Sequence, residues 1–249
     1  MIKILNYIVG SVRLIIVITI MAFYYLWFKL LRPFKKDKLA WGLRVQQLYT
    51  YPCLFFFGTK YSMEGQLYDQ PALYVSNHRS LLDPVIIRHY VTAMSVAKAE
   101  ISKYPVLGKS VAQTGIVFVN RSDKNSRSNA KDAIVETLKA GRPVLLFPEG
   151  TVSDLPTTLE FRRGSFEKAH EAGVPVIPIT LIYNHPRYYW YNMPTMTYYF
   201  QAFGLRTPKV HMIVGEPIMA STAEESMLRA RSVINSNLER VSYEDVRKS

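Results

Sequence analysis

A long apolar segment near the start of the chain, from Leu14 to Phe28, constrains the fold more than any other feature, because Thr19 is its only polar residue. Counted back to Ile4 across Arg13, it has roughly the 20 residues that a membrane-spanning helix needs. It ends in aromatic side chains, which are typical of the boundary between membrane and water. The segment predicts a membrane-associated helix. Because Arg13 interrupts it, a spanning helix and an interfacial helix are both open.

Two other interpretations of this segment are a cleaved signal peptide and a buried helix of a soluble protein. A signal peptide is disfavoured because basic residues, from Lys29 to Lys38, follow the run in place of a small-residue cleavage site. Residues 1–61 hold nine Lys and Arg and one acidic residue, so they carry +8 of the formal net charge of +12. Positive charge beside an apolar helix indicates contact with anionic lipid headgroups. It argues against a nucleic-acid partner, which would meet basic residues on a polar surface.

We therefore expect residues 1–61 to form a membrane anchor and residues 62–249 to form the catalytic or binding domain. The anchor includes a second apolar segment, from Val45 to Gly58, which is too short to span a membrane and contains Pro52. It is expected to lie in the interface beside the first segment. If the first segment spans, the positive-inside rule places the basic cluster, and with it the domain, on the cytoplasmic face.

Residues 62–249 alternate between short apolar runs and helical patterns. Helices are expected at 129–140, at 163–172, and from Thr222 to about Arg240, where a T-x-x-E capping box opens the last one. The aromatic stretch from Tyr183 to Phe203 is expected to be an irregular loop or hairpin. This alternation predicts an α/β fold with a mostly parallel twisted sheet flanked by helices. Six runs have the length and composition of buried strands: 72–76, 94–97, 116–120, 144–147, 174–182 and 210–214.

The first candidate site follows the strand at 72–76, where His78 precedes Asp83 by five residues. In a continuous helix these side chains diverge, since five residues turn it by about 500°. They meet only if His78 lies in the loop before a helix and Asp83 points back from the helix start. Asp83 would then accept from one ring nitrogen and leave the other free to take a proton. The alternative is a loop histidine and a helix-capping aspartate without contact.

Three further blocks lie at predicted strands. The run from Gly115 to Arg121 ends in a cation that either binds a phosphate or lies at the surface. The run from Phe147 to Thr151 either binds a ligand at the carboxyl edge of the sheet or forms an ordinary turn. The run from Val174 to Pro178 has two prolines, which predicts an edge or bulged strand. Cys53 is the single cysteine, which excludes an intramolecular disulfide framework, and no histidine has a carboxylate at zinc-ligand spacing.

In order, N-H-x-x-x-x-D, G-x-x-F-x-x-R, F-P-E-G-T and V-P-V-I-P resemble the motifs of the glycerolipid acyltransferase family that includes 1-acylglycerol-3-phosphate acyltransferase. The resemblance covers about residues 70–220 and the N-terminal apolar element. It implies a membrane-bound O-acyltransferase that moves a fatty acyl group from a thioester of coenzyme A or acyl carrier protein to the hydroxyl of a lysolipid. The implied acceptor is 1-acylglycerol-3-phosphate (lysophosphatidic acid), and the product is phosphatidic acid. No metal or redox cofactor is implied.

The resemblance also implies roles for individual residues. His78 resembles the general base, Asp83 its orienting partner, and Arg121 the phosphate-binding cation. Pro178 belongs to the block that shapes the acyl or acceptor pocket, and no serine or cysteine nucleophile is implied. The full set of implied substrate-binding residues is Asn77, Arg79, Gly115, Phe118, Arg121, Glu149, Gly150 and Thr151.

One position departs from the family pattern. Many members that use phosphatidic-acid precursors continue F-P-E-G-T with an arginine, whereas this chain has Val152. Arg162 and Arg163 could supply the missing charge. Another lysolipid, such as a lyso-ornithine lipid, is therefore an alternative acceptor. A non-catalytic lipid-binding membrane protein is a second alternative, which the intact His78 and Asp83 disfavour.

Overall fold

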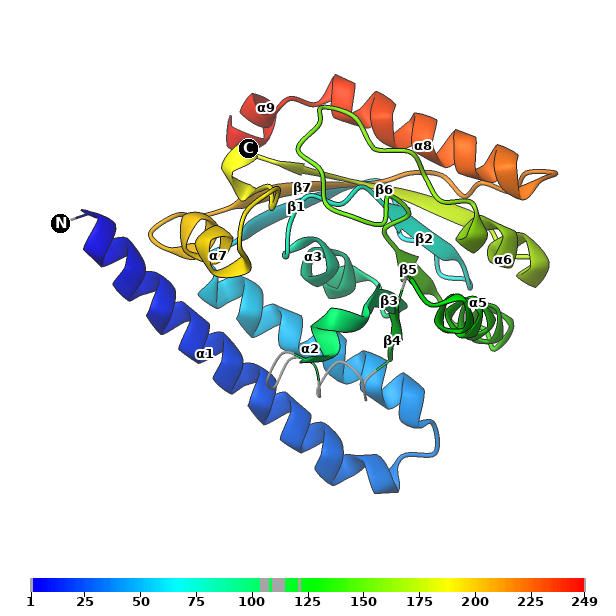
Figure 1. Cartoon of the computed structure of the whole chain (residues 1–249), viewed down its shortest axis with the longest axis horizontal. Coiled ribbons are helices and arrows are strands. Elements are labelled where there is room, and N and C mark those ends of the chain that lie inside the picture. Colours follow the sequence, from blue (N-terminus) through cyan, green and yellow to red (C-terminus); the bar gives the residue numbers. More distant parts are fainter. Residues whose placement is uncertain (1, 104–107, 109–114, 121, 249) are drawn as a thin grey trace.

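The computed structural model describes residues 2–103, 108, 115–120 and 122–248. The chain opens with two antiparallel helices, α1 (Ile2–Leu31) and α2 (Lys38–Phe56), joined through the 3₁₀ turn η1 (Arg32–Phe34) (Figure 1). Asp37 caps α2 by accepting hydrogen bonds from two main-chain nitrogens of its first turn, at 3.1 and 2.9 Å. The second apolar segment is thus mostly the latter part of a longer helix, with Pro52 inside it. It packs beside α1, as predicted.

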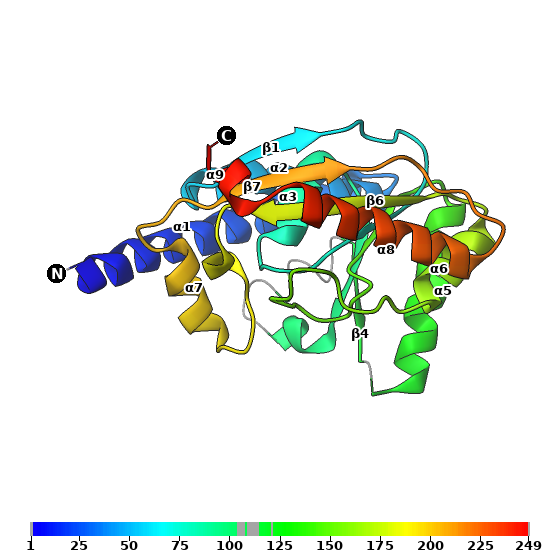
Figure 2. The same ribbon diagram turned by 90° about the horizontal axis from the view of Figure 1, so that it is seen from above.

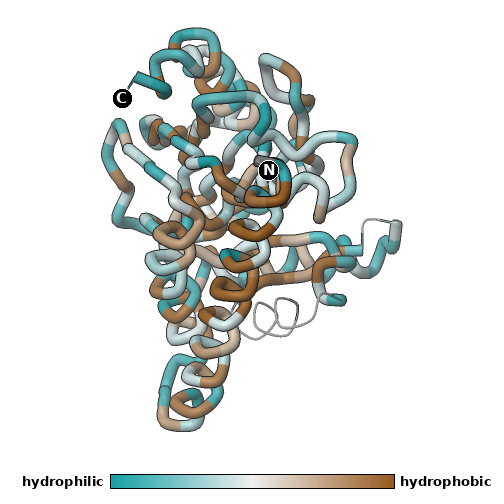
Figure 3. The backbone as a smooth tube through the Cα atoms, turned by 90° about the vertical axis from the view of Figure 1, so that its left-hand side faces the viewer, coloured by the Kyte–Doolittle hydropathy of each residue, from teal (hydrophilic) through white to brown (hydrophobic). Residues whose placement is uncertain are grey.

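The two N-terminal helices differ in how they meet the rest of the protein. Within the part of the chain that the structure describes, α1 with η1 is the one helical segment long and apolar enough, by length and composition, to cross a membrane. Hydrophobic residues follow most of its length (Figure 3), and many are exposed. In contrast, α2 contributes Leu43 and Leu54 to the core. The boundary at residue 61 remains a prediction.

A single seven-stranded sheet forms the centre of the molecule, in the order β1-β7-β6-β2-β5-β3-β4. All neighbouring strands are parallel except β6 and β7, which are antiparallel. The predicted α/β fold with a mostly parallel sheet is confirmed, and so are the six predicted strands. The strands are β1 (Lys60–Glu64), β2 (Leu73–Ser76), β3 (Met94–Lys98), β4 (Ile116–Val119), β5 (Val144–Leu146), β6 (Val176–Tyr183) and β7 (Lys209–Val214).

The expectation that the proline-containing run forms an edge strand is wrong, because β6 lies between β7 and β2. Its two prolines lie before the strand and at the end of its pairing with β7. Pro175 precedes the strand. The carbonyl oxygen of Pro178 accepts from Gly215 N at 2.8 Å, immediately after β7 ends. In a strand, the N–H and C=O groups of one residue point to the same side. The nitrogen of Pro178, which has no hydrogen to donate, therefore faces the end of the pairing between β6 and β7.

Helices cover both faces of the sheet (Figures 1 and 2). Alternate residues of β2 show the two layers: Tyr74 faces one core and Leu73 and Val75 face the other. The first core is closed by α2, α3 (Asp83–Tyr90) and α7 (Thr195–Phe203), and the second by α5 (Lys124–Lys139), α6 (Gly164–Ala172) and α8 (Ala223–Arg240). The capping box of α8 is confirmed, since Thr222 Oγ1 accepts from Glu225 N at 3.1 Å. The remaining helices are η2 (Ala99–Lys103), η3 (Pro186–Tyr188) and α9 (Tyr243–Lys248).

The aromatic stretch from Tyr183 to Phe203 is more regular than predicted. It begins in β6, continues through η3 and ends in α7. Tyr199 and Phe203 are both buried on α7, one turn apart. The helix forms here because tertiary burial of one face outweighs local propensity.

Candidate active site

A histidine and an aspartate meet where β2 ends. β2 stops at Ser76, and α3 begins at Asp83, so His78 lies in the intervening loop. His78 Nδ1 and Asp83 Oδ2 are 2.7 Å apart, with side chains 22% and 0% exposed. The contact is the one that the five-residue spacing allowed, with His78 before the helix and Asp83 pointing back from its first turn.

The buried carboxylate of Asp83 is held by hydrogen bonds on both oxygens. Oδ2 also accepts from the main-chain nitrogens of Arg79, at 2.6 Å, and Ser80, at 2.8 Å. Oδ1 accepts from the hydroxyl of Tyr183 on β6. These donors fix the orientation of the carboxylate, which lies in the first turn of α3.

The second ring nitrogen of His78 is available. Within the described residues, no hydrogen bond is made to Nε2. The ring stacks on Phe147, with centroids 4.2 Å apart and planes at 21°. Because the Asp83 carboxylate can only accept, the Nδ1 contact assigns the ring proton to Nδ1 and leaves a lone pair on Nε2. The site can therefore take a proton from a bound hydroxyl.

Glu149 lies at the end of β5, next to β2 in the sheet, and its two oxygens bind main-chain nitrogens. Oε1 accepts from His78 N at 2.8 Å, and Oε2 accepts from Leu159 N at 2.8 Å. Burial raises the pKa of this carboxyl above its ordinary value. Within the protein, Glu149 therefore braces the His78 loop against the segment 151–163, and its role in binding substrate stays a prediction.

Asn77 and Arg79 are likewise engaged within the protein. The Asn77 side-chain amide exchanges two hydrogen bonds with the main chain of Leu181, at 2.8 and 2.9 Å. Arg79 donates to the carbonyl oxygens of Ser153, at 2.8 Å, and Thr157, at 3.2 Å. Both residues are fully buried. Their contacts position the loop, and their role in binding substrate stays a prediction.

Gly150 and Thr151 form the turn after Glu149. Gly150 has a φ of +75°, which is unfavourable for any residue with a side chain. A Cβ added there would lie 2.8 Å from Arg162 Nε, so the guanidinium rests on this turn. Thr151 is exposed beside it. The structure thus brings the guanidinium of Arg162 against the turn that precedes Val152.

The G-x-x-F-x-x-R block lies on β4, three strands away from β2. Gly115 precedes β4, whereas His78 follows the parallel strand β2, so the two lie at opposite ends of the strands. A Cβ added to Gly115 would meet Leu43 of α2 at 2.5 Å. The part of Gly115 in substrate binding stays a prediction. Phe118 lies within β4 and is partly buried. Arg121 lies outside the described residues.

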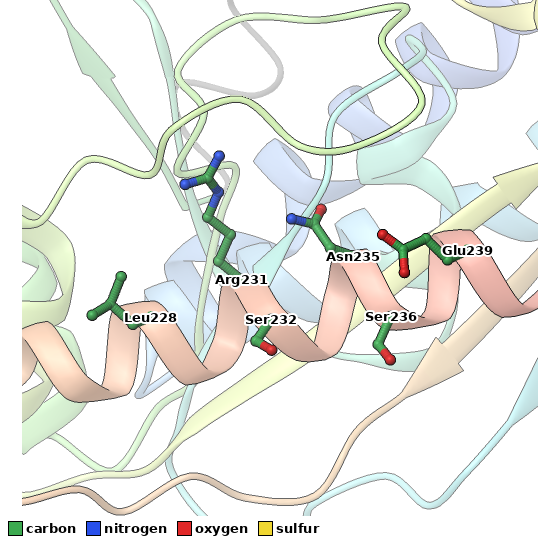
Figure 4. A pocket seen from close by; sticks show the side chains of 6 residues that line it. All are labelled: Leu228, Arg231, Ser232, Asn235, Ser236 and Glu239. Atoms are coloured by element: carbon green, nitrogen blue, oxygen red, sulfur yellow. The ribbon is translucent and has the colours of Figure 1, made fainter.

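A surface hollow on the outer side of α8 is distinct from this site (Figure 4). Arg231 Nη2 donates to Thr158 O at 3.3 Å, and Asn235 Oδ1 accepts from Thr158 N at 2.9 Å. Thr158 precedes Leu159, whose nitrogen binds Glu149. The polar residues of α8 therefore support the segment behind Glu149. The hollow is lined by Leu228, Arg231, Ser232, Asn235, Ser236 and Glu239.

Two other kinds of chemistry receive no support from the described residues. No cluster of three or more His, Cys, Asp or Glu side chains in this part of the chain could hold a metal ion. Cys53 is buried in α2, and burial raises the pKa of its thiol to about 12. A thiol with this pKa is not a ready nucleophile at neutral pH.

The chain is similar to known acyltransferases over about two thirds of its length. The chain is 33% identical, over 69% of its length, to a chloroplast 1-acyl-sn-glycerol-3-phosphate acyltransferase of Arabidopsis thaliana, and it spans 46% of that protein. It is 30% identical to a lyso-ornithine lipid O-acyltransferase of Brucella abortus, covering 70% of this chain and 69% of that protein. The chain thus spans about half the length of the plant relative and more than two thirds of the bacterial one.

The fold also has a solved counterpart. The 1-acyl-sn-glycerophosphate acyltransferase PlsC of Thermotoga maritima superposes with a TM-score of 0.76 at 24% identity, covering 96% of this chain and 97% of that one. The model of the Acyltransferase family matches residues 58–182, which contain His78, Asp83 and the F-P-E-G-T turn. The chain therefore belongs to the acyltransferase family.

Proposed function

We propose that the protein is a membrane-bound O-acyltransferase that moves a fatty acyl group from an acyl thioester to the free hydroxyl of a lysolipid. The proposed acceptor is 1-acylglycerol-3-phosphate, which would become phosphatidic acid. The observation that carries the proposal is the His78–Asp83 pair, with Nδ1 bound to Asp83 and Nε2 left available at a partly exposed ring.

In the proposed reaction His78 Nε2 takes the proton from the acceptor hydroxyl as the oxygen attacks the thioester carbonyl carbon. The tetrahedral intermediate then breaks the carbon–sulfur bond, and the leaving thiolate receives the proton from the imidazolium. Asp83 holds the ring and stabilises its transient positive charge. The donor is a thioester of coenzyme A or of acyl carrier protein, and its own activation leaves no step that needs a metal.

Direct attack by the acceptor is supported by the state of the nearby hydroxyl. Ser80 is buried, and its Oγ lies 2.6 Å from the hydroxyl of Tyr198 on α7. It is therefore committed to a structural hydrogen bond. Within the described residues, His78 makes no hydrogen bond to this oxygen, so a Ser–His nucleophile is not formed.

A phosphate-bearing acceptor is supported by Arg162, whose guanidinium rests on Gly150. Its neighbour Arg163 is instead paired with Glu167, at 2.9 Å, and Glu224, at 3.3 Å. A guanidinium is well suited to bind a phosphate through two hydrogen bonds. A lyso-ornithine lipid is the second candidate acceptor, because the Brucella relative named for it shares more than two thirds of its length with this chain.

The exposed apolar face of α1 and the basic turn after it support attachment to a membrane with anionic lipids. We place the catalytic domain on the cytoplasmic face, where thioester donors are made. The basic residues between Lys29 and Lys38 would then lie among the headgroups of that leaflet.

The test is an acceptor panel with purified protein in detergent micelles. Lysophosphatidic acid, lyso-ornithine lipid and other lysophospholipids are each offered with acyl-coenzyme A or acyl carrier protein thioester. We expect product from lysophosphatidic acid, and its loss in His78→Ala. The control is His170→Ala, which removes an exposed histidine of α6. Full activity of His78→Ala would contradict the mechanism, and product from lyso-ornithine lipid alone would contradict the acceptor.

A further inference from the structure

Tyr183 ends β6 directly beneath the proposed catalytic pair. Its side chain is fully buried, and its hydroxyl donates to Asp83 Oδ1. The two residues are 100 positions apart in the chain. The contact therefore depends on the sheet, which brings the carboxyl end of β6 beside that of β2.

The two oxygens of Asp83 have different partners. Oδ2 binds His78 Nδ1 and two main-chain nitrogens. Among the described residues, Oδ1 is bound by the Tyr183 hydroxyl. The three side chains thus form one hydrogen-bonded chain, from Tyr183 through Asp83 to His78. Rotation of the carboxylate about its own axis would break the bonds at both ends.

Tyr183 is a dependable donor in this hydrogen-bonded chain. Burial and the nearby negative charge of Asp83 hold its pKa well above the ordinary value for tyrosine. The hydroxyl therefore keeps its proton throughout the pH range in which a histidine titrates. A hydrogen bond from a neutral donor withdraws part of the charge of a carboxylate and lowers its basicity.

We propose that Tyr183 is a positioning residue of acyl transfer, which fixes the rotation of the Asp83 carboxylate and moderates its charge, and so sets the orientation and basicity of His78. The inference rests on the proposed function, in which His78 takes the proton from the acceptor. Tyr183 itself does not touch the reacting atoms, because Asp83 lies between it and the imidazole.

Removal of the hydroxyl has two expected effects. Asp83 Oδ1 loses its donor in a buried site, so the carboxylate is less well oriented, and kcat falls about tenfold or more. The remaining carboxylate is more basic and stabilises the imidazolium more strongly, so His78 holds its proton to a higher pH. The acidic limb of kcat/KM therefore moves to higher pH. KM for either substrate should change little, because neither contacts Tyr183.

The experiment compares Tyr183→Phe with the matched control Tyr188→Phe. Tyr188 is also buried, its ring centroid lies 6.3 Å from that of Tyr183, and its hydroxyl makes no hydrogen bond within the described part of the chain. Both variants lose the hydroxyl of a buried tyrosine, but only the first loses a bond to Asp83. We measure kcat, KM and the pH profile of kcat/KM with the acceptor that the wild type uses, and we check folding by thermal unfolding.

A second variant keeps the shape of the side chain. Fluorotyrosine in place of Tyr183 is a stronger donor, so it should move the acidic limb to lower pH, opposite to Tyr183→Phe. It reports on the same bond if Tyr183→Phe does not fold.

Opposite shifts in the two variants, with none in Tyr188→Phe, would support the role. Unshifted profiles, or the same loss in Tyr188→Phe, would overturn it while leaving an active wild type and the proposed function intact. A wild type that is inactive with every lysolipid and thioester would overturn the proposed function and this role with it.

Discussion

Arg13 Nη1 lies 2.7 Å from the carbonyl oxygen of Gly204, so the one cation inside the apolar stretch of α1 points at the end of α7. The same nitrogen is 3.2 and 3.1 Å from the carbonyl oxygens of Phe203 and Arg206. A helix ends in unpaired carbonyls that carry partial negative charge, and they favour a cation. The residue that interrupts the apolar run thus fastens the first half of α1 to the domain.

Replacing this arginine should weaken the fold more than it weakens membrane attachment. Arg13→Leu removes a charged donor from three carbonyl oxygens, and we expect the free energy of unfolding to fall by about 1–2 kcal/mol. Lys29→Gln is the control, since Lys29 contacts only the Tyr25 ring among the described residues. Thermal unfolding in micelles and flotation with vesicles measure the two properties. Loss of flotation without a change in melting temperature would contradict this prediction.

Replacing either member of the proposed catalytic pair should abolish acyl transfer, but the two variants should differ in their free energy of unfolding. Asp83→Ala leaves the Tyr183 hydroxyl and two main-chain nitrogens without an acceptor in a buried site, which should cost about 2–4 kcal/mol. His78→Ala removes a partly exposed ring and should cost about 1 kcal/mol. Denaturant unfolding of both variants measures the difference. Equal stabilities would mean that the Asp83 bonds do not order the loop.

Stability should depend on pH through Glu149. Because burial raises its pKa, Glu149 stabilises the fold fully below the ordinary value of 4.5, and this stabilisation is lost as pH rises through the raised pKa. Relative to Glu149→Gln, the wild type should therefore be most stable in acid and lose its advantage towards neutral pH. Urea unfolding at several pH values tests this, with Glu160→Gln, an exposed position in the same segment, as control. Parallel pH curves for wild type and Glu149→Gln would refute the assignment.

The turn after Glu149 should not accept a side chain. Gly150→Ala places a methyl group in a left-handed conformation and against Arg162, so we expect a loss of about 2 kcal/mol or more. Gly173→Ala isolates the first effect, since Gly173 has a φ of +67° and nothing within 4 Å of an added Cβ; it should lose about 1 kcal/mol. Unfolding free energies of both variants decide the point. Equal losses of unfolding free energy in the two variants would show that the Arg162 side chain moves aside without cost.

Arg162 and Arg163 should have different roles. We expect Arg162 to bind substrate and Arg163 to form structural ion pairs. Arg162→Ala is expected to raise KM for lysophosphatidic acid about tenfold, the equivalent of one charge-assisted hydrogen bond. KM for a monoacylglycerol, which lacks the phosphate, should not change. Arg163→Ala removes a residue already paired with Glu167 and Glu224, and should leave both values unchanged. A rise in KM for both acceptors would mean that Arg162 supports the turn at Gly150 and does not bind the phosphate.

The sequence predicts the buried strands well, because runs such as Val144–Leu146 are apolar throughout and need no partner to be recognised. It misses β1, whose five residues are all exposed and include two charges, so no apolar run marks the strand. β1 forms because its main chain pairs with β7. An edge strand of this kind depends on pairing with a distant strand, and no local sequence pattern indicates that pairing.

The candidate site likewise has a part that the sequence predicts and a part that depends on tertiary structure. The His78–Asp83 contact follows from a local spacing, and the structure contains it. The Tyr183 contact could not be predicted, because it depends on the register of β6 against β2. The motif order also suggests that Gly115 joins the site. In the structure, Gly115 precedes β4 and His78 follows the parallel strand β2, three strands away, so the two lie at opposite ends of the strands.

Several of the contacts that shape the His78 loop come from residues about 100 positions later in the chain. Leu181 binds Asn77, Tyr183 binds Asp83, and Tyr198 binds Ser80. A ribosome adds about 5–20 residues per second and releases the N-terminal part first. His78 and Asp83 therefore emerge beside the membrane helix seconds before the strand that orders them. A nascent or truncated chain that stops short of β6 would carry both residues without the frame that joins them, so the proposed acyl transfer should require synthesis to continue past β6.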